Sequence, residues 1–400
     1  MSDAQDRTRP TPLAGLRVVE LTHMVMGPAA GAILVELGAD VVRIEPVDGD
    51  PTRTLLGSGA GYFPMYNRNK RSVCIDIKRP EGAAVARRLI ASCDVLVENF
   101  RPGALERLGL GYERLREDNE RLIYCSEKGF LGGPYQDRTA LDEVVQMMSG
   151  LAYMTGPPGT PLRAGASVVD VTGGMFGVIG ILAALQERER TGRGQRVSSA
   201  LFETAVYLVG QHMAQLAVTG EAAPPMPARI SAWAIYDIFT TRDGGQVFLG
   251  IVSDGLWQKF CERFGLEQLA GDPEYRTNAQ RVRARPSLLP QLRAIVSAFS
   301  KVELLERLEG SGLPYAGIGR PEEMFADPHL LASGGLVTTQ LPDGRETRLP
   351  ALPIELSGNR PNAGGRLPRP GEDSRAILSG LGIGSAELDR LTSDGVIGAS

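Results

Sequence analysis

The stretch LRVVELTHMVMGPAAGAILVELGADVVRIEP, residues 16–46, decides the fold of this chain. Two short apolar runs, 16–21 and 41–44, enclose a longer apolar segment in which Pro28 stands near the start and Gly38 near the end. Proline suits the first turn of a helix, and glycine suits the residue after its end. The order of strand, helix and strand predicts a βαβ unit, and therefore a parallel sheet with a right-handed crossover.

The sheet is predicted to continue along the chain, because three more apolar runs have the length of strands. They lie at 73–77, 95–97 and 122–126, with a helix at 80–92 after the first. Asn99 and Lys128 follow the last two runs closely. Ligands of open parallel sheets collect beyond the carboxyl ends of the strands, so we expect both side chains at a ligand site.

Two further polar positions near strands have competing interpretations. The basic bend NRNKRS at 67–72 either binds phosphates or is a solvated turn, and the sequence leaves both open. Glu45, at the end of the second strand, is interpreted as a solvated strand end, because the Gly-x-Gly-x-x-Gly fingerprint of a dinucleotide-binding turn is missing before it. The missing fingerprint also argues against a nicotinamide dehydrogenase.

Asp170 stands at the start of the most apolar helix of the chain, which is expected to be buried on most sides and to end at Gly192 and Gly194. One interpretation makes Asp170 the N-cap of this helix, a position that aspartate favours. The other makes it a nucleophilic carboxylate in a cleft. In either case the free N–H groups and the dipole of the helix are expected to favour the charged carboxylate.

Composition limits the classes of partner and compartment. The 400 residues have a net charge of −4, which argues against a nucleic-acid partner, since phosphate binding needs a basic surface. Cys74, Cys93 and Cys125 lie in or beside apolar runs and are expected to be core residues of a protein in a reducing compartment. The three histidines are too scattered to suggest a metal site. With no signal peptide and no uninterrupted run of about 18 apolar residues, the protein is expected to be cytoplasmic and outside the membrane.

Two segments rich in proline and small residues, 221–229 and 360–371, divide the chain. A hairpin and helices between them read as a second domain. We therefore expect an α/β protein with the amino-terminal part of a large Rossmann-like domain at 1–225. A small α+β domain is expected as an insertion at 226–330, and a return segment at 331–400 is expected to complete the large domain.

Several motifs occur in a fixed order: LTHMVMGP (21–28), LGADVVRIEP (37–46), NKRS (69–72), VENFRPGALERLG (97–109) and GASVVDVTGGM (165–175). Together they resemble the class III CoA-transferases, a family that includes formyl-CoA and carnitine CoA-transferases and the α-methylacyl-CoA racemases. The resemblance covers nearly the whole chain. It implies an interlocked homodimer, acyl-CoA and carboxylic acid substrates, and no permanently bound cofactor, coenzyme A entering as a thioester substrate.

The resemblance also implies roles for single residues. Asp170 would attack the acyl-CoA thioester, form an anhydride and then an aspartyl-CoA thioester, and pass CoA to an acceptor carboxylate. Backbone N–H groups near Asp170 are expected to hold the oxyanion. The CoA contacts of the family fall on His23, Met24, Ile75, Asn99, Arg107 and Lys128. One further family contact falls on Pro46 here, and the arginines expected to replace it are Arg43, Arg71 or Arg101.

The main alternative is an acyl-CoA racemase or epimerase of the same family. Such racemases place a histidine before an aspartate at the start of the preceding helix, and here the pair is Leu141 and Asp142. Two-base racemisation would lack one base, so a transferase is predicted. A CoA-binding module without turnover is a further alternative, against which the position of Asp170 speaks.

The segment 128–156 resembles family members that act on C4–C5 dicarboxylates. Mesaconyl-CoA C1–C4 transfer, or succinyl-CoA with a dicarboxylic acceptor, is therefore expected. Arg138 or Arg163 is expected to bind the second carboxylate, because a guanidinium holds a carboxylate with two hydrogen bonds. Residues 227–233 contain no glycine run like the loop of formyl-CoA transferases, which disfavours that substrate class.

Overall fold

A computed structural model describes residues 11–229, 232–361 and 364–398. The chain forms two compact units. The first consists of residues 1–227 and 328–400, and the second of residues 228–327. Each unit has its own core and is described separately.

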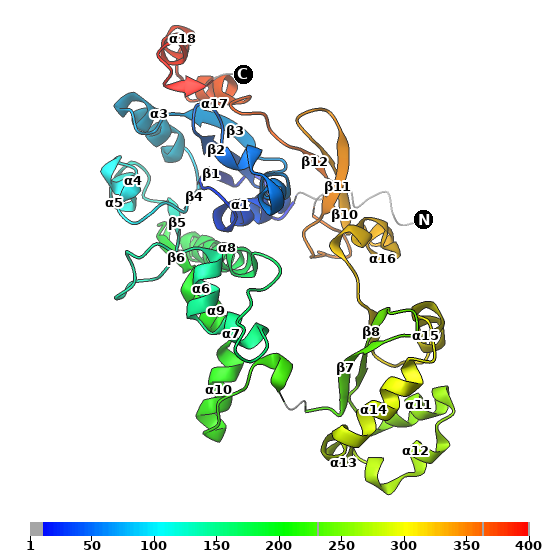
Figure 1. Ribbon diagram of the computed structural model, residues 1–400. Coiled ribbons are helices and arrows are strands. Elements are labelled where there is room, and N and C mark those ends of the chain that lie inside the picture. The colour runs from blue at the N-terminus through cyan, green and yellow to red at the C-terminus, as the bar shows by residue number, and fades with distance from the viewer. Residues whose placement is uncertain (1–10, 230–231, 362–363, 399–400) are drawn as a thin grey trace. The chain divides into compact units, whose positions relative to one another are not determined.

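The first unit is built on a seven-stranded sheet (Figure 1) with the order β13-β3-β2-β1-β4-β5-β6. The strands are β1 (Arg17–Leu21), β2 (Asp40–Glu45), β3 (Arg71–Ile75), β4 (Val95–Glu98), β5 (Ile123–Lys128), β6 (Arg196–Ala200) and β13 (Ile397–Gly398). All pairs from β3 through to β6 are parallel, and β13 pairs antiparallel with β3. The predicted βαβ unit and parallel sheet are confirmed.

Helices cover both faces of this sheet, because its central strands are apolar on both sides. On one face, α1 (Met26–Glu36) and α8 (Val168–Thr191) pack against β1, β4 and β5 through residues such as Leu34, Val97 and Ile181. On the other face lie α3 (Pro80–Ala91), α5 (Tyr112–Asp118), α17 (Ser374–Gly380) and α18 (Ser385–Ser393). Cys74, Cys93 and Cys125 are buried, as predicted.

The remaining elements of the first unit are short helices and a small sheet. The helices are α2 (Tyr62–Tyr66), α4 (Ala104–Arg107), α6 (Asp142–Met148), α7 (Leu151–Thr155), α9 (Leu201–Leu208), α10 (Gly210–Thr219) and α16 (Pro328–Ala332). The small sheet has the order β11-β10-β12, from β10 (Leu336–Gln340), β11 (Glu346–Pro350) and β12 (Gly365–Arg366).

The second unit packs helices against a three-stranded antiparallel sheet of order β7-β8-β9. Its elements are β7 (Ile235–Thr240), β8 (Gln246–Ile251), α11 (Asp254–Phe264), α12 (Glu267–Gly271), α13 (Asn278–Arg283), α14 (Arg285–Val296), α15 (Lys301–Leu308) and β9 (Tyr315–Gly317). Trp257, Phe260 and Leu288 are fully buried in its core. The domain division expected from the sequence, with a small domain inserted at 226–330, stays a prediction.

The mostly apolar segment 199–219 does not form one continuous helix. The chain there forms the edge strand β6, then α9, and then α10 after a break at Val209. Ser199 and Ala200 complete the sheet by pairing with Glu127 and Lys128. An edge strand of five residues, exposed at its start, has no apolar run from which it could be read.

The burial expected for α8 is also wrong. Gly173, Gly174 and Gly177 let its buried face approach α1 and β5 closely, because a Cβ at any of them would lie within 2.7 Å of a neighbouring atom. The opposite face is exposed, with Met175 47 % and Ile179 58 % accessible. In the described parts of the chain α8 is also the one helix long and apolar enough to cross a membrane by length and composition alone. Core helices of globular proteins pass the same test, and α8 packs against α1, β5 and β6.

Candidate active site

A cavity of about 260 Å³ lies at the carboxyl edge of the large sheet. It is placed where the strand order reverses, between β1 and β4, which is where open α/β sheets bind ligands. The cavity brings together six of the predicted site residues: His23, Met24, Asn99, Lys128, Arg163 and Asp170. The start of α8 is fixed there by an apolar cluster in which Val169 packs with Val145 of α6 and Leu201 of α9.

Asp170 is the third residue of α8 and does not cap it. The residue at the N-cap, Ser167, makes no side-chain capping bond. Instead, Oδ2 of Asp142, the first residue of α6, accepts hydrogen bonds from the backbone N–H groups of Val169 (2.9 Å) and Asp170 (3.0 Å). The N-cap interpretation of Asp170 is therefore wrong, and its carboxylate remains available to the cavity.

The N–H groups at the start of α8 are all engaged. Those of Val169 and Asp170 bind Asp142, and those of Val168 and Val171 bind the carbonyls of Ala166 and Ser167. The expectation that N–H groups beside Asp170 hold an oxyanion is not met by these four donors. Sequence reasoning missed this use of Asp142, although its place at a helix start, 28 residues before Asp170, was visible.

The electrostatic setting of Asp170 differs from the expected one. Burial raises the pKa of Asp170 to about 7, the negative charge of Asp142 adds to this rise, and Arg163 opposes it. A second carboxylate thus occupies the positive end of the helix, and the dipole no longer favours charge on Asp170. The prediction that the helix start favours the charged form of Asp170 is wrong, and the group titrates near neutral pH.

Asn99 shapes the loop after β1. Its Oδ1 accepts from the backbone N–H of His23 (2.9 Å), and its Nδ2 donates to the carbonyl of the same residue (2.8 Å). The next residue, Met24, has φ +64°, a strained conformation for a side chain of this kind. Burial lowers the pKa of His23, so the imidazole at the cavity is neutral at pH 7.

Lys128 ends β5 with its ammonium paired inside the protein. Its Nζ donates to Oε1 of Glu98 (2.6 Å) and to the carbonyl of Phe100 (3.1 Å). Arg163, which also lines the cavity, forms an ion pair with the exposed Glu143. Arg163 is thus a cation at the cavity whose partner is accessible to solvent and can be exchanged for a ligand.

Three predicted contact residues lie away from the cavity. Ile75 is buried in β3 beside Ile397, Arg107 is exposed on α4, and Arg138 lies over the ring of Tyr135 (5.0 Å) on an exposed loop. None of the three is among the residues that line the cavity in the described structure. Their roles in binding CoA or a second carboxylate stay predictions.

Two of the three basic side chains in the bend at 67–72 are buried and paired. Arg68 is buried against Glu36, and Lys70 is buried against Glu20 (2.7 Å). For these two residues both interpretations of the bend are wrong, whereas Arg71 is partly exposed and pairs with Asp40.

Of the three arginines expected to replace the family contact at Pro46, one remains a candidate. Arg43 is buried, donating to Glu20 (2.7 Å) and Asp50, so it cannot replace a contact at Pro46. Arg71 lies at the opposite edge of the sheet, which leaves Arg101, exposed after β4. Glu45 is buried and bound to Arg53 and Ser72, so its interpretation as a solvated strand end is wrong as well.

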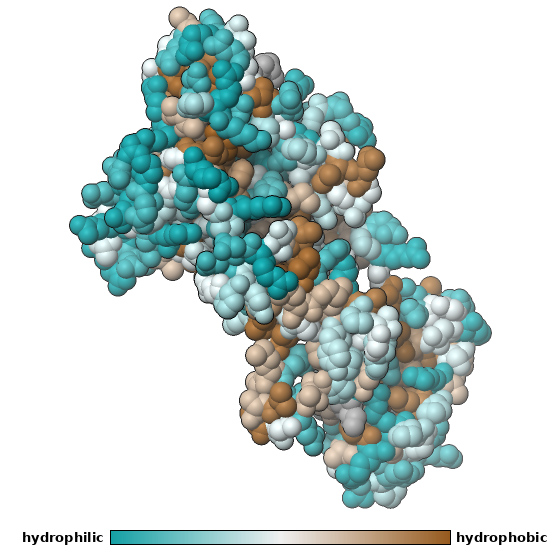
Figure 2. Space-filling model, turned by 60° about the vertical axis from the view of Figure 1, so that its left-hand side comes forward, coloured by the Kyte–Doolittle hydropathy of each residue, from teal (hydrophilic) through white to brown (hydrophobic). Residues whose placement is uncertain are grey.

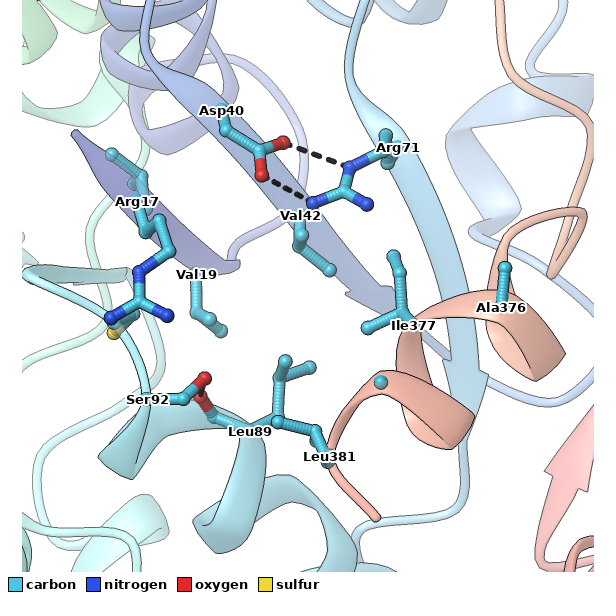
Figure 3. A pocket seen from close by; sticks show the side chains of 13 residues that line it. Arg17, Val19, Asp40, Val42, Arg71, Leu89, Ser92, Ala376, Ile377 and Leu381 are labelled. Atoms are coloured by element: carbon cyan, nitrogen blue, oxygen red, sulfur yellow. Dashed lines mark hydrogen bonds and ion pairs between the residues drawn. The ribbon is translucent and has the colours of Figure 1, made fainter. Parts of the chain in front are cut away.

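A second cavity, of about 220 Å³, lies at the amino edge of the sheet (Figure 3). Arg71 and Asp40 form an ion pair on its rim, with Nε 2.8 Å from Oδ1, and both side chains are about two-fifths exposed. Apolar residues of β1, β2, α3 and α17 form most of the rest of the wall, to which Arg17 and Ser92 also contribute. No group of three or more potential metal ligands is found in the described residues, at this cavity or elsewhere.

Comparison with known proteins finds relatives of nearly the whole chain. The family model of CoA-transferase family III matches residues 13–374. The chain is 36 % identical over 389 residues to the succinate–glutarate CoA-transferase of Agrobacterium fabrum, which covers 93 % of this chain and 96 % of the relative. It is also 36 % identical over 411 residues to a formyl-CoA:oxalate CoA-transferase of Streptomyces avermitilis, covering 96 % and 99 %.

A solved structure supports the same assignment. The crystal structure of a CAIB/BAIF family protein from Brucella suis superposes with a TM-score of 0.83 at 34 % identity, over 93 % of this chain and 100 % of that one. Family match, relatives and fold all extend over nearly the whole chain. The chain is therefore an enzyme that belongs to CoA-transferase family III.

Proposed function

We propose that the protein moves CoA from an acyl-CoA thioester to a free carboxylate, with Asp170 as the nucleophile. The observation that carries the proposal is that two different aspartates serve the start of α8, one as the helix cap and the other at the cavity. Asp142 caps the helix, so the carboxylate of Asp170, which lines the cavity, is not needed for capping. Because burial brings its pKa to about 7, Asp170 is ionised in a large fraction of molecules at neutral pH.

The reaction has two matched halves. The Asp170 carboxylate attacks the thioester carbonyl, the C–S bond breaks, and CoA thiolate leaves an aspartyl anhydride. The thiolate then attacks the Asp170 carbonyl of the anhydride, releasing the donor acid and forming an aspartyl-CoA thioester. The acceptor carboxylate repeats the sequence in reverse, and Asp170 returns to its free form. CoA is a substrate throughout, and no other cofactor is needed for these steps.

We propose a short dicarboxylate as the acid. The names of the two relatives above include succinate, glutarate and oxalate, all of which are dicarboxylates. Arg163, at the cavity with an exposed partner, is the better candidate for the second carboxylate than the exposed Arg138. Mesaconyl-CoA (C1 to C4 transfer) and succinyl-CoA with a dicarboxylic acceptor are the donors to try first.

The position of Leu141 supports transfer over racemisation. Leu141 lies at the cavity, 59 % exposed, at the point where the racemases of this family are expected to have a basic histidine. An aliphatic side chain cannot return a proton to an α-carbon. Exchange of the α-hydrogen of the acyl group with deuterated water would support the racemase alternative.

We also propose an interlocked homodimer with residues 226–330 as the inserted small domain. Large apolar side chains gather in patches on the surface (Figure 2). On α8, α9 and α10 the exposed ones are Met175, Ile179, Leu182, Tyr207, Leu208, Met213, Leu216 and Val218. Exposed apolar side chains in such number are typical of a permanent subunit interface. The cytoplasmic location remains part of this proposal.

Covalent trapping tests the function. The protein is incubated with mesaconyl-CoA, succinyl-CoA or glutaryl-CoA, quenched with hydroxylamine or borohydride, and digested for mass spectrometry. We expect a modified peptide that contains Asp170, and the thioester that gives the highest yield identifies the donor. Asp170→Asn, which has the same shape and cannot form an anhydride, is the matched control. A protein that binds CoA tightly but is never modified would not be a transferase of this mechanism.

A further inference from the structure

Glu127 is a buried carboxyl group at the same cavity, and the mechanism above gives it no role. It precedes Lys128 on β5 and is 2 % exposed. Side chains alternate along a strand, so Glu127 lies on the same face as Cys125, toward α8. A Cβ at Gly177 would be 2.5 Å from Oε1 of Glu127, which shows how closely the carboxyl group packs against this helix.

Glu127 and Asp170 meet along one helix face. Gly177 follows Asp170 by seven residues, or two helical turns, so the two positions lie on the same side of α8. The Glu127 side chain therefore runs along the side of the helix that bears Asp170. Both residues line the cavity.

The carboxyl group has no hydrogen-bond partner among the described residues. Both of its oxygens are buried, and neither accepts a hydrogen bond. An ionised carboxylate in this position would be very costly, whereas the protonated acid avoids most of that cost. The un-ionised form is thus the one that this site accommodates.

The charged groups on the neighbouring elements either favour the un-ionised form of Glu127 or are already paired with another residue. Glu20 on β1, Glu98 on β4 and Asp170 on α8 are negative, and Lys70 before β3 is the positive group that faces Glu127. Lys70 already pairs with Glu20 at 2.7 Å. Burial, followed by the charges of Glu20, Glu98 and Asp170, raises the pKa of Glu127 to about 8.

The nearest lysine along the chain offers no compensation either. Lys128 points to the other face of β5 and pairs with Glu98 at 2.6 Å. Cys125, on the same face as Glu127, is buried, and its pKa is raised by burial, so the thiol is neutral. Glu127 therefore has no cation of its own.

We propose that Glu127 acts as an un-ionised carboxylic acid that keeps its part of the cavity wall neutral, so that it adds no negative charge to those of Asp170 and Asp142 beside the bound thioester. This inference rests on the proposed function, since it concerns the reactivity of Asp170. Glu127 is a positioning residue that acts through the field at Asp170. When Glu127 loses its proton, an additional negative charge in a poorly solvated wall repels the acid substrate and the departing thiolate.

The consequence is a loss of activity at basic pH. Above about pH 8, where Glu127 ionises, kcat/KM falls about tenfold for each pH unit. Glu127→Gln keeps the size and neutrality of the acid and removes the titration. We expect its activity at neutral pH to stay within about threefold of the wild type and the basic loss to disappear.

The experiment measures CoA transfer and the yield of Asp170 adduct across the pH range for four proteins. Beside the wild type and Glu127→Gln, the control is Glu113→Gln, an exposed glutamate on α5, which should retain the basic loss. Glu127→Asp, which restores an acid, should bring the loss back. A wild type without a basic loss, or a Glu127→Gln variant that retains it, overturns the inference.

A second measurement separates this inference from the proposed function. Infrared difference spectra of the wild type labelled with ¹³C-glutamate, taken below and above pH 8, should show the carbonyl band of a protonated glutamic acid that disappears on ionisation. This readout needs neither activity nor a folded variant. If no thioester modifies the wild type but the band is present, the proposed function fails and the un-ionised state of Glu127 stands. If the band is absent, Glu127 is ionised and the inference fails.

Discussion

Two cavities of similar volume lie at opposite edges of one parallel sheet, about 260 Å³ at the carboxyl edge and about 220 Å³ at the amino edge. At the amino edge, Arg71 and Asp40 satisfy each other on the rim and remain accessible to water. At the carboxyl edge, Asp170 and Glu127 are carboxyl groups with raised pKa values and no paired cation. Volume alone does not distinguish the two, whereas the state of their charged groups does.

The difference teaches where the fold keeps reactive groups. An exposed ion pair contributes little to stability and does not make either of its groups reactive. Carboxyl groups held in a cavity near their titration point are costly to fold and are typical of catalytic sites. The contrast predicts that changes at the carboxyl edge alter catalysis, and that equivalent changes at the amino edge leave it intact.

Asp170→Asn should have the largest effect. The amide cannot form an anhydride, so we expect kcat to fall at least about 10⁴-fold with folding intact. CoA-transfer assays and circular dichroism measure the two properties. Substantial turnover by this variant would remove the basis for treating the carboxyl edge as the reactive one.

Arg163→Ala should raise KM for the dicarboxylic acid by about 10- to 100-fold, because a charge-assisted pair with the substrate is lost. Arg163→Lys should recover part of this loss, and Arg138→Ala should have a smaller effect. Steady-state kinetics with a dicarboxylate and a monocarboxylate of the same length measure the change. If KM for the dicarboxylate is unchanged in both alanine variants, neither arginine binds the second carboxylate.

Activity should also fall at acidic pH, since the reacting form of Asp170 is ionised. With its pKa at about 7, kcat/KM should fall about tenfold per pH unit below that value. Asp142→Asn removes a negative charge that raises the pKa of Asp170, so the acidic loss should move to lower pH. The pH dependence of kcat/KM for the two proteins checks this. An unshifted profile would mean that Asp142 serves only as the helix cap.

Asp170→Asn should stabilise the fold above neutral pH. A carboxyl group whose pKa is about 7 in the folded state and 3.8 as a model value destabilises the folded protein as pH rises between these values, and fully above 7. Removing the group should add up to about 4 kcal/mol to the free energy of unfolding at pH 8 and nothing below pH 3.8. Urea unfolding at both extremes measures it, and equal gains at both pH values would point to another cause.

Arg71→Ala, at the amino edge, should have the smallest effect. We expect unchanged kcat/KM and a loss of less than about 1 kcal/mol in the free energy of unfolding, because the pair with Asp40 is exposed. The same assays apply. A large loss of activity in Arg71→Ala would contradict the conclusion that only the carboxyl edge of the sheet takes part in catalysis.

The sheet and its carboxyl edge were readable from the sequence, because buried parallel strands are continuous apolar runs and Asn99 and Lys128 follow them closely. The two-residue strand β13 and the edge strand β6 were not, since neither has an apolar run of its own. Such strands are defined by the neighbours with which they pair.

The electrostatics of the site was harder to predict from the sequence than the fold. Pairs such as Arg68 with Glu36 and Lys70 with Glu20 join residues 32 and 50 positions apart, so no local sequence pattern predicts them. Asp170 was identified by its place at a helix start, but its pKa depends on Asp142, which arrives from another helix. Glu127 was visible as a carboxylate inside a buried strand, and its lack of a partner could only be seen in three dimensions.

The cap that Asp142 provides to α8 has a consequence for the reaction cycle. In the proposed mechanism Asp170 changes from a charged acid to a neutral anhydride and thioester and back in every turnover. A residue that also held the helix end together would release it each time it was acylated. Because the cap belongs to Asp142, the scaffold is independent of the chemical state of the reacting group. The enzyme can thus pass through several covalent forms on an unchanged frame.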